Sequence, residues 1–542
     1  MEPSRLSCIS LMFLTLAVLV KAQEVLVTVE QGNLRGTTAT SVYNTSYTAF
    51  LGIPYATPPL GRLRFQAPQP AENWEGVRNA TQYGSDCIQP DGSGSEDCLY
   101  LNVYVPGVPE EGAQLPVMFW VYGGGFRGGS GSDEEYGPDF LVSYGVILVT
   151  INYRLGQLGF LSTGDAVAPG NAGLKDQRLA LTWVQRNIAS FGGDPQQITI
   201  FGHSAGGMSI SLHFVSPMSA GLFSRAIIQS GNFITVRPRT IEEARTHTLR
   251  LGAALGYATN DSQHLLDFLQ SVNSTDLLVD DSLIQTDEEK KHIISVLWAP
   301  NIEPDMEGAF LSDSPIQMLI DGRFSKVPVM TGTTSAESGS GVLENSELIA
   351  NLNEDFAGVV GPSLHLPTVE QQTEAAYELK GFYFGNNNIS ADNPDPLVYF
   401  NEDLSFCDPN DAFIRKVVEV SNLTVYYYVV DYRGDIMLTN PYGVSHGAEL
   451  TLLFMRKDKD YNFDPESEED KVRRNTLRVW TNFAKYGNPT PEADPVVWEP
   501  YDLSSRSYLL MQANFSLAHD RLGERMDFWR ENVPLLPFPD TL

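Results

Sequence analysis

The sequence is short of basic residues, of cysteine and of long hydrophobic runs. Its 542 residues hold 36 Lys and Arg against 67 Asp and Glu, which gives a formal net charge of −31. A negative surplus of this size works against binding to nucleic acid or to an anionic membrane. The plainest consequence of the negative charge is solubility, although a negative electrostatic field also favours cationic ligands. We therefore expect no nucleic-acid partner.

Cysteine is too scarce for a disulfide-rich scaffold. Of the four cysteines, Cys8 lies in the N-terminal segment, while Cys87 and Cys98 are eleven positions apart around the turn-rich residues 88–95. A disulfide could close that loop in an oxidising compartment. Cys407 is then unpaired. No nucleophilic-cysteine context surrounds it, so we expect a buried, inert thiol.

The only apolar run of note lies at the N-terminus. Arg5 precedes residues 11–20, and Ala22 offers a small residue at a cleavage point before Gln23. This is the pattern of a signal peptide, and the run is short for a membrane-spanning helix. We expect residues 1–22 to be a signal peptide and residues 23–542 to be secreted, with no membrane anchor.

Asparagine sequons agree with a secreted protein. Seven N-x-[ST] triplets occur, and together with a signal peptide they predict a glycosylated surface. Their asparagines are Asn44, Asn79, Asn260, Asn273, Asn388, Asn422 and Asn514.

Low-complexity linkers and internal repeats are also absent, and apolar residues, 42% of the chain, are spread evenly. We therefore expect one large α/β domain over residues 23–542 rather than several domains. Strand-like and helical stretches alternate, which is typical of a mostly parallel sheet flanked by helices. The predicted strands are residues 117–121, 146–151, 197–200, 226–229, 327–331, 425–430 and 507–511. The predicted helices are residues 174–187 and 520–529, with helical insertions at 241–321 and 370–392.

The most informative motif is Gly202-His203-Ser204-Ala205-Gly206, which follows a short β-branched strand. In G-x-S-x-G the two glycines allow a sharp turn that exposes the serine hydroxyl at the top of a sheet. Serine is a weak nucleophile alone, so this interpretation requires a base, an acid and an oxyanion hole elsewhere.

A glycine loop offers the oxyanion hole. Gly123, Gly124 and Gly125 directly follow a predicted central strand. Consecutive glycines leave backbone N–H groups free and allow a substrate to approach closely. A flexible surface loop is the alternative, but the aromatic residues on both sides favour the functional interpretation.

The base and the acid must follow the serine in the chain. Of eight histidines, His446 has the most suggestive context, a loop after a strand, whereas His519 falls in a charged, helical stretch. Glu337 directly follows the predicted strand 327–331, which carries a carboxylate to the carboxyl edge of the sheet. Asp435 is the competing acid, but no strand followed directly by a glycine loop presents it.

These motifs together resemble the type-B carboxylesterases, the family of cholinesterases and carboxylesterases, over almost the whole chain. The serine motif is joined by further matches in the same order. These are residues 52–56, 58–61, 96–104, 152–154, 191–195 and 447–450. The resemblance implies an α/β-hydrolase fold with large helical insertions. It also implies hydrolysis of small carboxylic esters without a metal or a cofactor.

The resemblance assigns a role to each candidate residue. It implies a Ser204–His446–Glu337 triad, in which Ser230 hydrogen-bonds the acid. The backbone N–H groups of Gly124, Gly125 and Ala205 would form the oxyanion hole. Two structural ion pairs are implied as well, Arg64 with Glu96 and Arg154 with Asp176.

Two departures narrow the substrate. Cholinesterases carry a tryptophan for the choline cation in the loop that matches Cys87–Cys98, and this loop has no aromatic residue. They also have glutamate where this chain has His203. Both departures weigh against acetylcholine. Residues 294–300 resemble the acyl-pocket stretch, where Ile294 and Val296 suggest room for acyl groups larger than acetyl.

The sequence therefore predicts a secreted serine carboxylesterase. A cholinesterase or lipase of the same family is the alternative among enzymes. A cholinesterase-like adhesion module without activity is the alternative from another class, and it has no need of Ser204, Glu337, His446 and the glycine loop together. A scavenger that is acylated at Ser204 but released slowly also fits. The natural ester and the oligomeric state stay open.

Overall fold

The structure, a computed structural model, describes residues 24–491 and 496–536. The expected signal peptide, residues 1–22, lies outside them.

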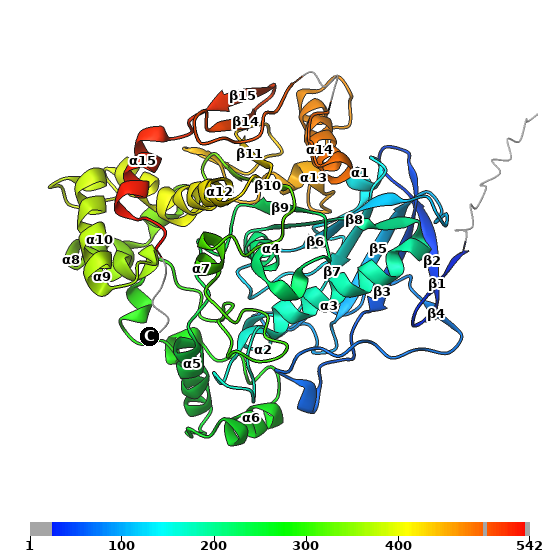
Figure 1. The fold of residues 1–542 in the computed structure, drawn as a ribbon, viewed down its shortest axis with the longest axis horizontal. Helices are drawn as coiled ribbons and strands as arrows, with labels where there is room; N and C mark the ends of the chain where they lie inside the picture. The colour runs from blue at the N-terminus through cyan, green and yellow to red at the C-terminus, as the bar shows by residue number, and fades with distance from the viewer. Residues whose placement is uncertain (1–23, 492–495, 537–542) are drawn as a thin grey trace, which may run out of the picture.

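A 13-stranded sheet runs through the described residues in the order β1-β2-β3-β5-β7-β6-β8-β9-β10-β11-β14-β15, with β4 beside β2 (Figure 1). The first seven strands are β1 (Glu24–Val29), β2 (Gly32–Thr40), β3 (Ser46–Pro54), β4 (Val77–Asn79), β5 (Tyr100–Pro106), β6 (Leu115–Val121) and β7 (Ile147–Ile151). The others in this sheet are β8 (Gly193–His203), β9 (Arg225–Gln229), β10 (Val329–Thr334), β11 (Val425–Val430), β14 (Ser507–Met511) and β15 (Phe515–His519), while β12 (Thr439–Asn440) and β13 (Gly443–Val444) form a separate pair.

The centre of the sheet is parallel and its edges are antiparallel. Strands β7, β6, β8, β9, β10, β11 and β14 pair in parallel. All residues of β7, β10 and β11 are buried, which explains why these strands read as unbroken apolar or small-residue runs. Parallel pairing brings the carboxyl ends of β6, β8, β9, β10 and β11 to one edge. The mostly parallel, helix-flanked sheet that the sequence predicts is confirmed.

Helices cover both faces of the sheet. Helices α3 and α4 pack on β8 and β9, and α12 packs on β10 and β11, whereas α1 and α14 pack together against β6, β7 and β8 on the other face. The first seven α-helices are α1 (Asp139–Val142), α2 (Gly156–Phe160), α3 (Ala172–Asn187), α4 (Ala205–Val215), α5 (Ile241–Ala254), α6 (Ser262–Ser271) and α7 (Pro315–Ile320). The others are α8 (Ser346–Glu354), α9 (Phe356–Val360), α10 (Val369–Phe384), α11 (Pro394–Glu402), α12 (Asp408–Val420), α13 (Leu450–Leu453), α14 (Glu468–Tyr486) and α15 (Gly523–Asn532). No helix of the described residues is long and apolar enough to cross a membrane.

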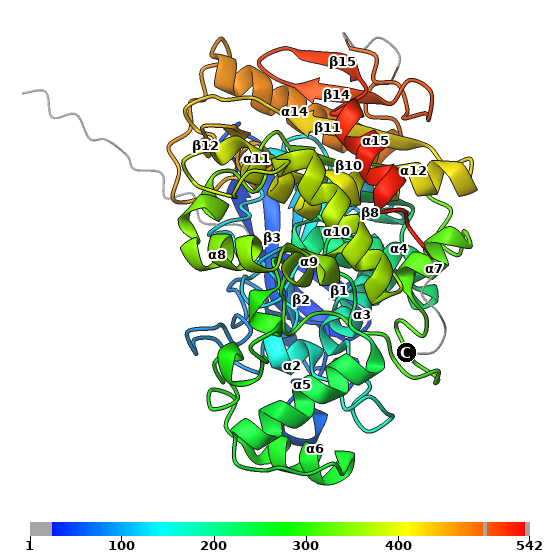
Figure 2. The same cartoon turned by 90° about the vertical axis from the view of Figure 1, so that its left-hand side faces the viewer.

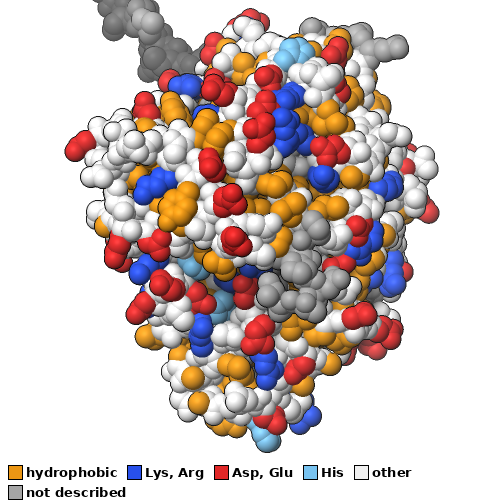
Figure 3. All heavy atoms as spheres, turned by 60° about the vertical axis from the view of Figure 1, so that its left-hand side comes forward, with side chains coloured by type: hydrophobic (Ala, Val, Ile, Leu, Met, Phe, Trp, Pro, Cys, Tyr) orange, Lys and Arg blue, Asp and Glu red, His pale blue; other side chains and the backbone are white. Residues whose placement is uncertain are grey.

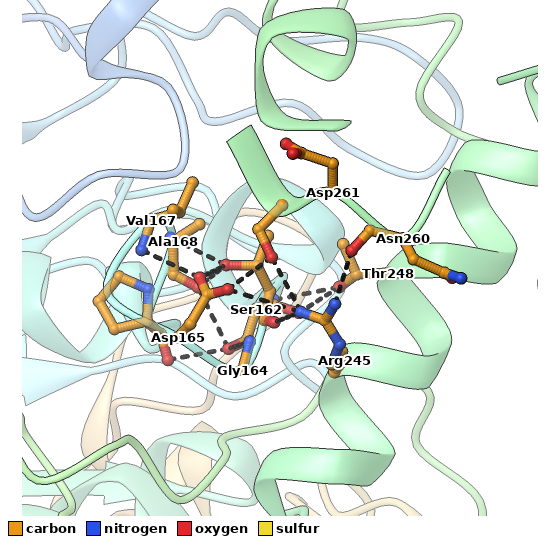
Figure 4. A network of polar contacts seen from close by, with 12 residues as sticks. Ser162, Gly164, Asp165, Val167, Ala168, Arg245, Thr248, Asn260 and Asp261 are labelled. Carbon is orange, nitrogen blue, oxygen red and sulfur yellow. Dashed lines mark hydrogen bonds and ion pairs between the residues drawn. The ribbon is translucent and has the colours of Figure 1, made fainter. Parts of the chain in front are cut away.

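Two helical lobes extend from the sheet (Figures 1 and 2). The lower lobe contains α5 and α6. The other lobe contains α8 to α11, and with α15 it has a hydrophobic core of its own that includes Phe356, Phe400 and Trp529. Arg245 anchors α5 to the segment after α2: its guanidinium donates to the carbonyl of Thr163 at 2.6 Å and lies 3.5 Å from Asp165 (Figure 4).

The predicted helical content of residues 241–321 is partly wrong. Helices α5, α6 and α7 are present, but between α6 and α7 the chain forms only short 3-10 turns. Pro300 and Pro304 interrupt this stretch, and proline cannot supply the N–H that a helix interior needs. The second predicted insertion helix ends early, since α10 stops at Gly385, where φ is +57°.

The C-terminal prediction also needs correction. His519 was expected in a helical stretch, but it ends β15, which pairs with β14, and α15 begins only at Gly523. Its expected exposure is confirmed. Residues 515–519 are drawn into strand because each faces a residue of β14 across an antiparallel ladder.

The negative charge is distributed over the surface. On the face shown in Figure 3, acidic, basic and hydrophobic side chains are interspersed rather than gathered by kind. Many acidic residues have a partner: Asp133 and Glu134, for example, both bind Lys457 at 2.8 Å. On this face the excess of acidic residues therefore favours solubility rather than a single charged binding patch.

Candidate active site

Ser204 lies at a strained turn between β8 and α4. Its φ of +57° and ψ of −124° are outside the regions that L-residues usually adopt. The backbone is held there by two hydrogen bonds, from the N–H of Ser204 to the carbonyl of Gln229 at 2.9 Å and from the N–H of Met208 to the carbonyl of Ser204 at 2.8 Å. The side chain is half-buried, so the hydroxyl remains reachable.

The glycines of the motif are required sterically. A Cβ on Gly202 would lie 2.6 Å from the carbonyl carbon of Gly206, and a Cβ on Gly206 would lie 2.1 Å from the carbonyl oxygen of Val121. Both distances are far below contact distance. The strand-to-helix turn can therefore pack against β6 only with glycine at both positions, as the sequence predicts.

Glu337 and His446 are joined at the carboxyl edge of the sheet. Nδ1 of His446 lies 2.5 Å from Oε2 of Glu337, and the backbone N–H of His446 donates to the carbonyl of Glu337 at 3.3 Å. The Glu337 side chain is fully buried, while 31% of the His446 side chain is exposed. Because Nδ1 faces the carboxylate, Nε2 is the ring nitrogen left for a serine hydroxyl or a substrate.

The second oxygen of Glu337 is held as firmly as the first. Oε1 accepts hydrogen bonds from the hydroxyl of Ser230 and from the N–H of Thr334, both at 2.6 Å. Ser230 follows Gln229 at the end of β9, the residue whose carbonyl holds the N–H of Ser204. The structure thus brings Ser204, Ser230 and Glu337 to the ends of three adjacent strands, β8, β9 and β10.

The charges of the pair stabilise each other. Burial raises the pKa of Glu337, but the neighbouring His446 and the hydrogen bonds to the carboxylate outweigh it and lower that pKa below 4.5. Burial lowers the pKa of His446, and the Glu337 charge outweighs it, so that this pKa is raised above 6.5. A carboxylate beside an imidazole that readily gains a proton is the arrangement that general acid–base chemistry needs.

The competing acid and base lie elsewhere. Asp435 is exposed, and no hydrogen bond or ion pair joins it to a histidine among the described residues. His519 is exposed and contacts Ser507, with 3.3 Å between Nδ1 and Oγ.

The glycine loop borders Ser204. A Cβ on Gly123 would lie 3.0 Å from Cβ of Ser204 and 2.6 Å from the carbonyl oxygen of His203. Gly124 has a φ of +100°, and its carbonyl accepts the N–H groups of Arg127 and Gly128 at 3.0 and 3.2 Å. Gly125 has a φ of +63° with open space where a Cβ would be.

The expected oxyanion donors are free. In residues 24–491 and 496–536, the N–H groups of Gly124, Gly125 and Ala205 have no hydrogen-bond acceptor. Ala205 is the first residue of α4, a position whose N–H has no partner within the helix. These groups are available to a developing negative charge near Ser204.

A buried polar group lies behind His446. The ring centroids of His203 and His446 are 4.3 Å apart, and Nε2 of His203 lies 4.0 Å from Oε1 of Glu449. Burial drives the pKa of His203 well below 6.5, and burial with the Glu337 charge raises that of Glu449 to about 7. Burial therefore favours the neutral form of His203, whose ring packs on that of His446.

The other sequence predictions are tested directly. Cys87 and Cys98 form the predicted disulfide, and Cys407 is a buried free thiol. The predicted ion pairs are present, Arg64 with Glu96 at 2.6 Å and Arg154 with Asp176 at 2.7 Å. All seven sequon asparagines are exposed. The side chain of Asn260 points away from the Arg245 network that binds its carbonyl (Figure 4).

The expected acyl-pocket stretch has more polar surroundings than its sequence suggests. Ile294 and Val296 border a cavity of about 140 Å³ that is also lined by Arg239, His247 and His365. Arg239 donates to the carbonyl of Val296 at 2.6 Å. The aliphatic side chains of this stretch thus share the cavity with charged and imidazole groups.

Sequence reasoning missed the contacts that Glu402 and Phe406 make with Glu337 and His446. The carboxylate of Glu402 accepts the N–H groups of Glu337 and Ser338 at 2.8 Å, and the ring of Phe406 lies 5.0 Å from that of His446. Glu402 ends α11 and Phe406 follows it, and no motif marks either residue. Only the fold brings them to the site.

Comparisons with known proteins point in one direction. A family model described as the carboxylesterase family matches residues 23–529. A cholinesterase from Mus musculus is 34% identical over 547 residues, which cover 94% of this chain and 87% of that protein. A carboxylic ester hydrolase from Bombus ignitus is 33% identical, with 92% of each chain covered. The solved structure of juvenile hormone esterase from Manduca sexta, with OTFP covalently attached, has a TM-score of 0.83 at 28% identity and covers 94% of this chain and 99% of that one.

Proposed function

This chain belongs to the carboxylesterase family and is a carboxylic-ester hydrolase, and we propose that it acts through an acyl-enzyme formed on Ser204. His446 is the general base and acid of this proposal, and Glu337 orients its ring. The observation that carries the proposal is the 2.5 Å contact between Nδ1 of His446 and the buried Glu337, which leaves Nε2 of His446 for a hydroxyl, at the same edge of the sheet as the strained Ser204.

The first half of the cycle forms the acyl-enzyme. Nε2 of His446 takes the proton of the Ser204 hydroxyl as its oxygen attacks the ester carbonyl. The carbonyl oxygen becomes an oxyanion, which accepts hydrogen bonds from the N–H groups of Gly124, Gly125 and Ala205. The imidazolium then returns the proton to the departing alkoxide, and the alcohol leaves.

The second half repeats these steps with water. His446 takes a proton from water, the hydroxide attacks the acyl carbon, and the Ser204 oxygen leaves with a proton from His446. Glu337 stays ionised throughout and stabilises the imidazolium in both halves. Its lowered pKa supports this role.

We propose uncharged carboxylic esters as substrates rather than choline esters. The loop closed by Cys87 and Cys98 has no aromatic side chain to receive a quaternary ammonium. Its Gln89 instead binds the backbone of Gly129, at the end of the glycine loop. His203 stands where a cholinesterase has glutamate. Burial keeps the pKa of His203 well below 6.5, so this side chain is neutral at pH 7 and does not supply the negative charge of a glutamate.

We also propose that the protein is secreted and glycosylated after loss of residues 1–22. The Cys87–Cys98 disulfide and the exposure of all seven sequon asparagines support an oxidising, extracellular setting. Treatment of the secreted protein with an N-glycosidase should lower its mass, and N-terminal sequencing should begin at Gln23.

The proposal is tested by turnover of p-nitrophenyl esters of increasing acyl chain length. Continuous turnover with an optimum at some chain length supports it and identifies the acyl preference. A single burst of p-nitrophenol equal to the enzyme concentration, without turnover, would contradict hydrolysis and indicate a scavenger. No release above that of a Ser204→Ala protein would indicate a binding module.

A further inference from the structure

Glu402 has an unusual position at the end of α11. Glu402 is only 6% exposed, and its carboxylate faces the backbone of Glu337, the acid of the proposed triad. Oε1 accepts the N–H of Glu337 and Oε2 accepts the N–H of Ser338, both at 2.8 Å. Two adjacent N–H groups on one carboxylate form a pair of charge-assisted hydrogen bonds. This pair fixes the backbone from which the Glu337 side chain projects.

The chain that follows Glu402 reaches the base as well. Residues Asp403–Cys407 form a π-helix between α11 and α12. Within it, Phe406 packs on the ring of His446, with 5.0 Å between centroids. π-helical turns are rare and occur often at functional sites. One short segment of the α8–α11 lobe thus contacts both members of the Glu337–His446 pair.

The charges around Glu402 come from several elements. Glu337 faces it from the loop after β10. Arg521 faces it from the turn before α15, where its guanidinium donates to the hydroxyl of Tyr427 at 2.9 Å and to the carbonyl of Thr334 at 3.1 Å. Asp403, the next residue, is paired with Arg525. Burial and the Glu337 charge raise the pKa of Glu402 to about 7, and Arg521 opposes this.

The charge of Glu402 also acts on His446. Glu337, Glu449 and Glu402 all raise the pKa of the imidazole. An ionised Glu402 therefore favours the imidazolium that forms during ester hydrolysis. Its two hydrogen bonds and its charge act together, because both depend on the carboxylate being ionised.

We propose that Glu402 is a positioning residue for ester hydrolysis, which anchors the backbone of Glu337 and supports the charge of His446 from the helical lobe. The inference rests on the proposed roles of Glu337 and His446. It assigns the α8–α11 lobe a part in the chemistry as well as in covering the sheet.

The test compares Glu402→Gln, which removes the charge but keeps the shape, with Glu402→Asp, which keeps the charge but is one methylene shorter. Glu378→Gln, on the exposed surface of α10, is the matched control. The kinetic parameters kcat and KM are measured for p-nitrophenyl esters between pH 5 and 9. Each preparation is normalised to the fraction labelled by a fluorophosphonate, so that unfolded molecules lower the titre and not kcat.

The Gln variant should lose roughly 10- to 100-fold in kcat with little change in KM, because a displaced acid misplaces the base. Without the negative charge, the acid limb of its kcat/KM profile should move down by roughly half a pH unit. The Asp variant should lose kcat but keep the acid limb. The Glu378→Gln variant should match the wild type in both.

Wild-type kcat and a wild-type acid limb in both Glu402 variants would overturn the inference. A lower fraction of labelled protein with unchanged kcat and KM would also overturn the inference, since it indicates a purely structural role for Glu402. These results are distinct from a failure of the proposed function, in which the wild-type protein itself is neither labelled nor active.

Discussion

Gln89 exchanges two hydrogen bonds with the backbone of Gly129. Its Nε2 donates to the carbonyl of Gly129 at 3.0 Å, and its Oε1 accepts the N–H of Gly129 at 2.9 Å. Gln89 belongs to the loop closed by the Cys87–Cys98 disulfide, and Gly129 lies in the same connection between β6 and α1 as Gly123, Gly124 and Gly125. The disulfide loop therefore contacts the segment that contains Gly124 and Gly125, the proposed oxyanion donors.

Replacement of Gln89 by alanine should weaken transition-state stabilisation. Without the two hydrogen bonds, each worth about 1 kcal/mol, the glycine loop moves more freely around its active arrangement. We expect kcat to fall about tenfold with little change in KM. Gln185→Ala is the control, since Gln185 also donates to a glycine carbonyl, that of Gly221, but on the surface. Equal kcat in the two variants would contradict a link between the disulfide loop and the site.

Removal of the disulfide should affect both stability and activity. In the chain-entropy description, opening a loop of 11 residues costs about 3 kcal/mol of unfolding free energy. The double variant Cys87→Ser, Cys98→Ser should therefore unfold at a lower urea concentration. Its kcat should fall like that of Gln89→Ala. A destabilised variant that keeps full kcat would show that the disulfide supports the fold alone.

Alanine at Gly125 tests the oxyanion hole. The position has a φ of +63° and open space at the Cβ, so a methyl group meets no neighbour but strains the backbone that carries the proposed donor. We expect kcat to fall roughly 100-fold, the effect typical of losing one oxyanion donor. The control is Gly145→Ala, with a φ of +72°, open space and a position at the opposite, amino end of β7. It carries similar strain and should keep wild-type kcat.

In the proposed mechanism, the dependence of activity on pH follows from His446. Catalysis needs its neutral form, and its pKa is raised above 6.5 by Glu337. The rate constant kcat/KM should therefore fall as the pH drops through a value above 6.5. In Glu337→Gln the negative charge is absent, so this acid limb should move to lower pH while kcat falls about 10⁴-fold. An acid limb that stays in place in this variant would show that another group controls the limb.

The sequence could predict the turn at Ser204 because the parts of this turn are local. Gly202, Ser204 and Gly206 form one turn whose geometry depends on residue type alone. Both acids follow buried parallel strands, but Glu337 follows β10, which only β9 separates from the strand that leads into Ser204, whereas Asp435 follows β11, one strand further away, and is exposed. Chain order and strand periodicity were enough to select these residues as candidates.

What the sequence could not predict depends on long-range packing. Glu402 is 65 residues from Glu337 and lies at the end of a helix with no motif, and the register of that helix against the sheet decides where its carboxylate points. Residues 241–321 were expected to be a helical insertion, but between α6 and α7 side chains bind much of the backbone, as where Arg239 binds the carbonyl of Val296. Such contacts form only once the lobes have docked on the sheet.

Covalent labelling of Ser204 tests the central proposal most directly. The protein is incubated with a fluorophosphonate and digested, and the modified peptide is identified by mass spectrometry, while ester turnover is measured in parallel. We predict one adduct, on Ser204, loss of turnover in proportion to labelling, and a loss of roughly 10⁵-fold or more in kcat for Ser204→Ala. An adduct on another residue, or a Ser204→Ala protein that hydrolyses esters at the wild-type rate, would contradict the proposed mechanism.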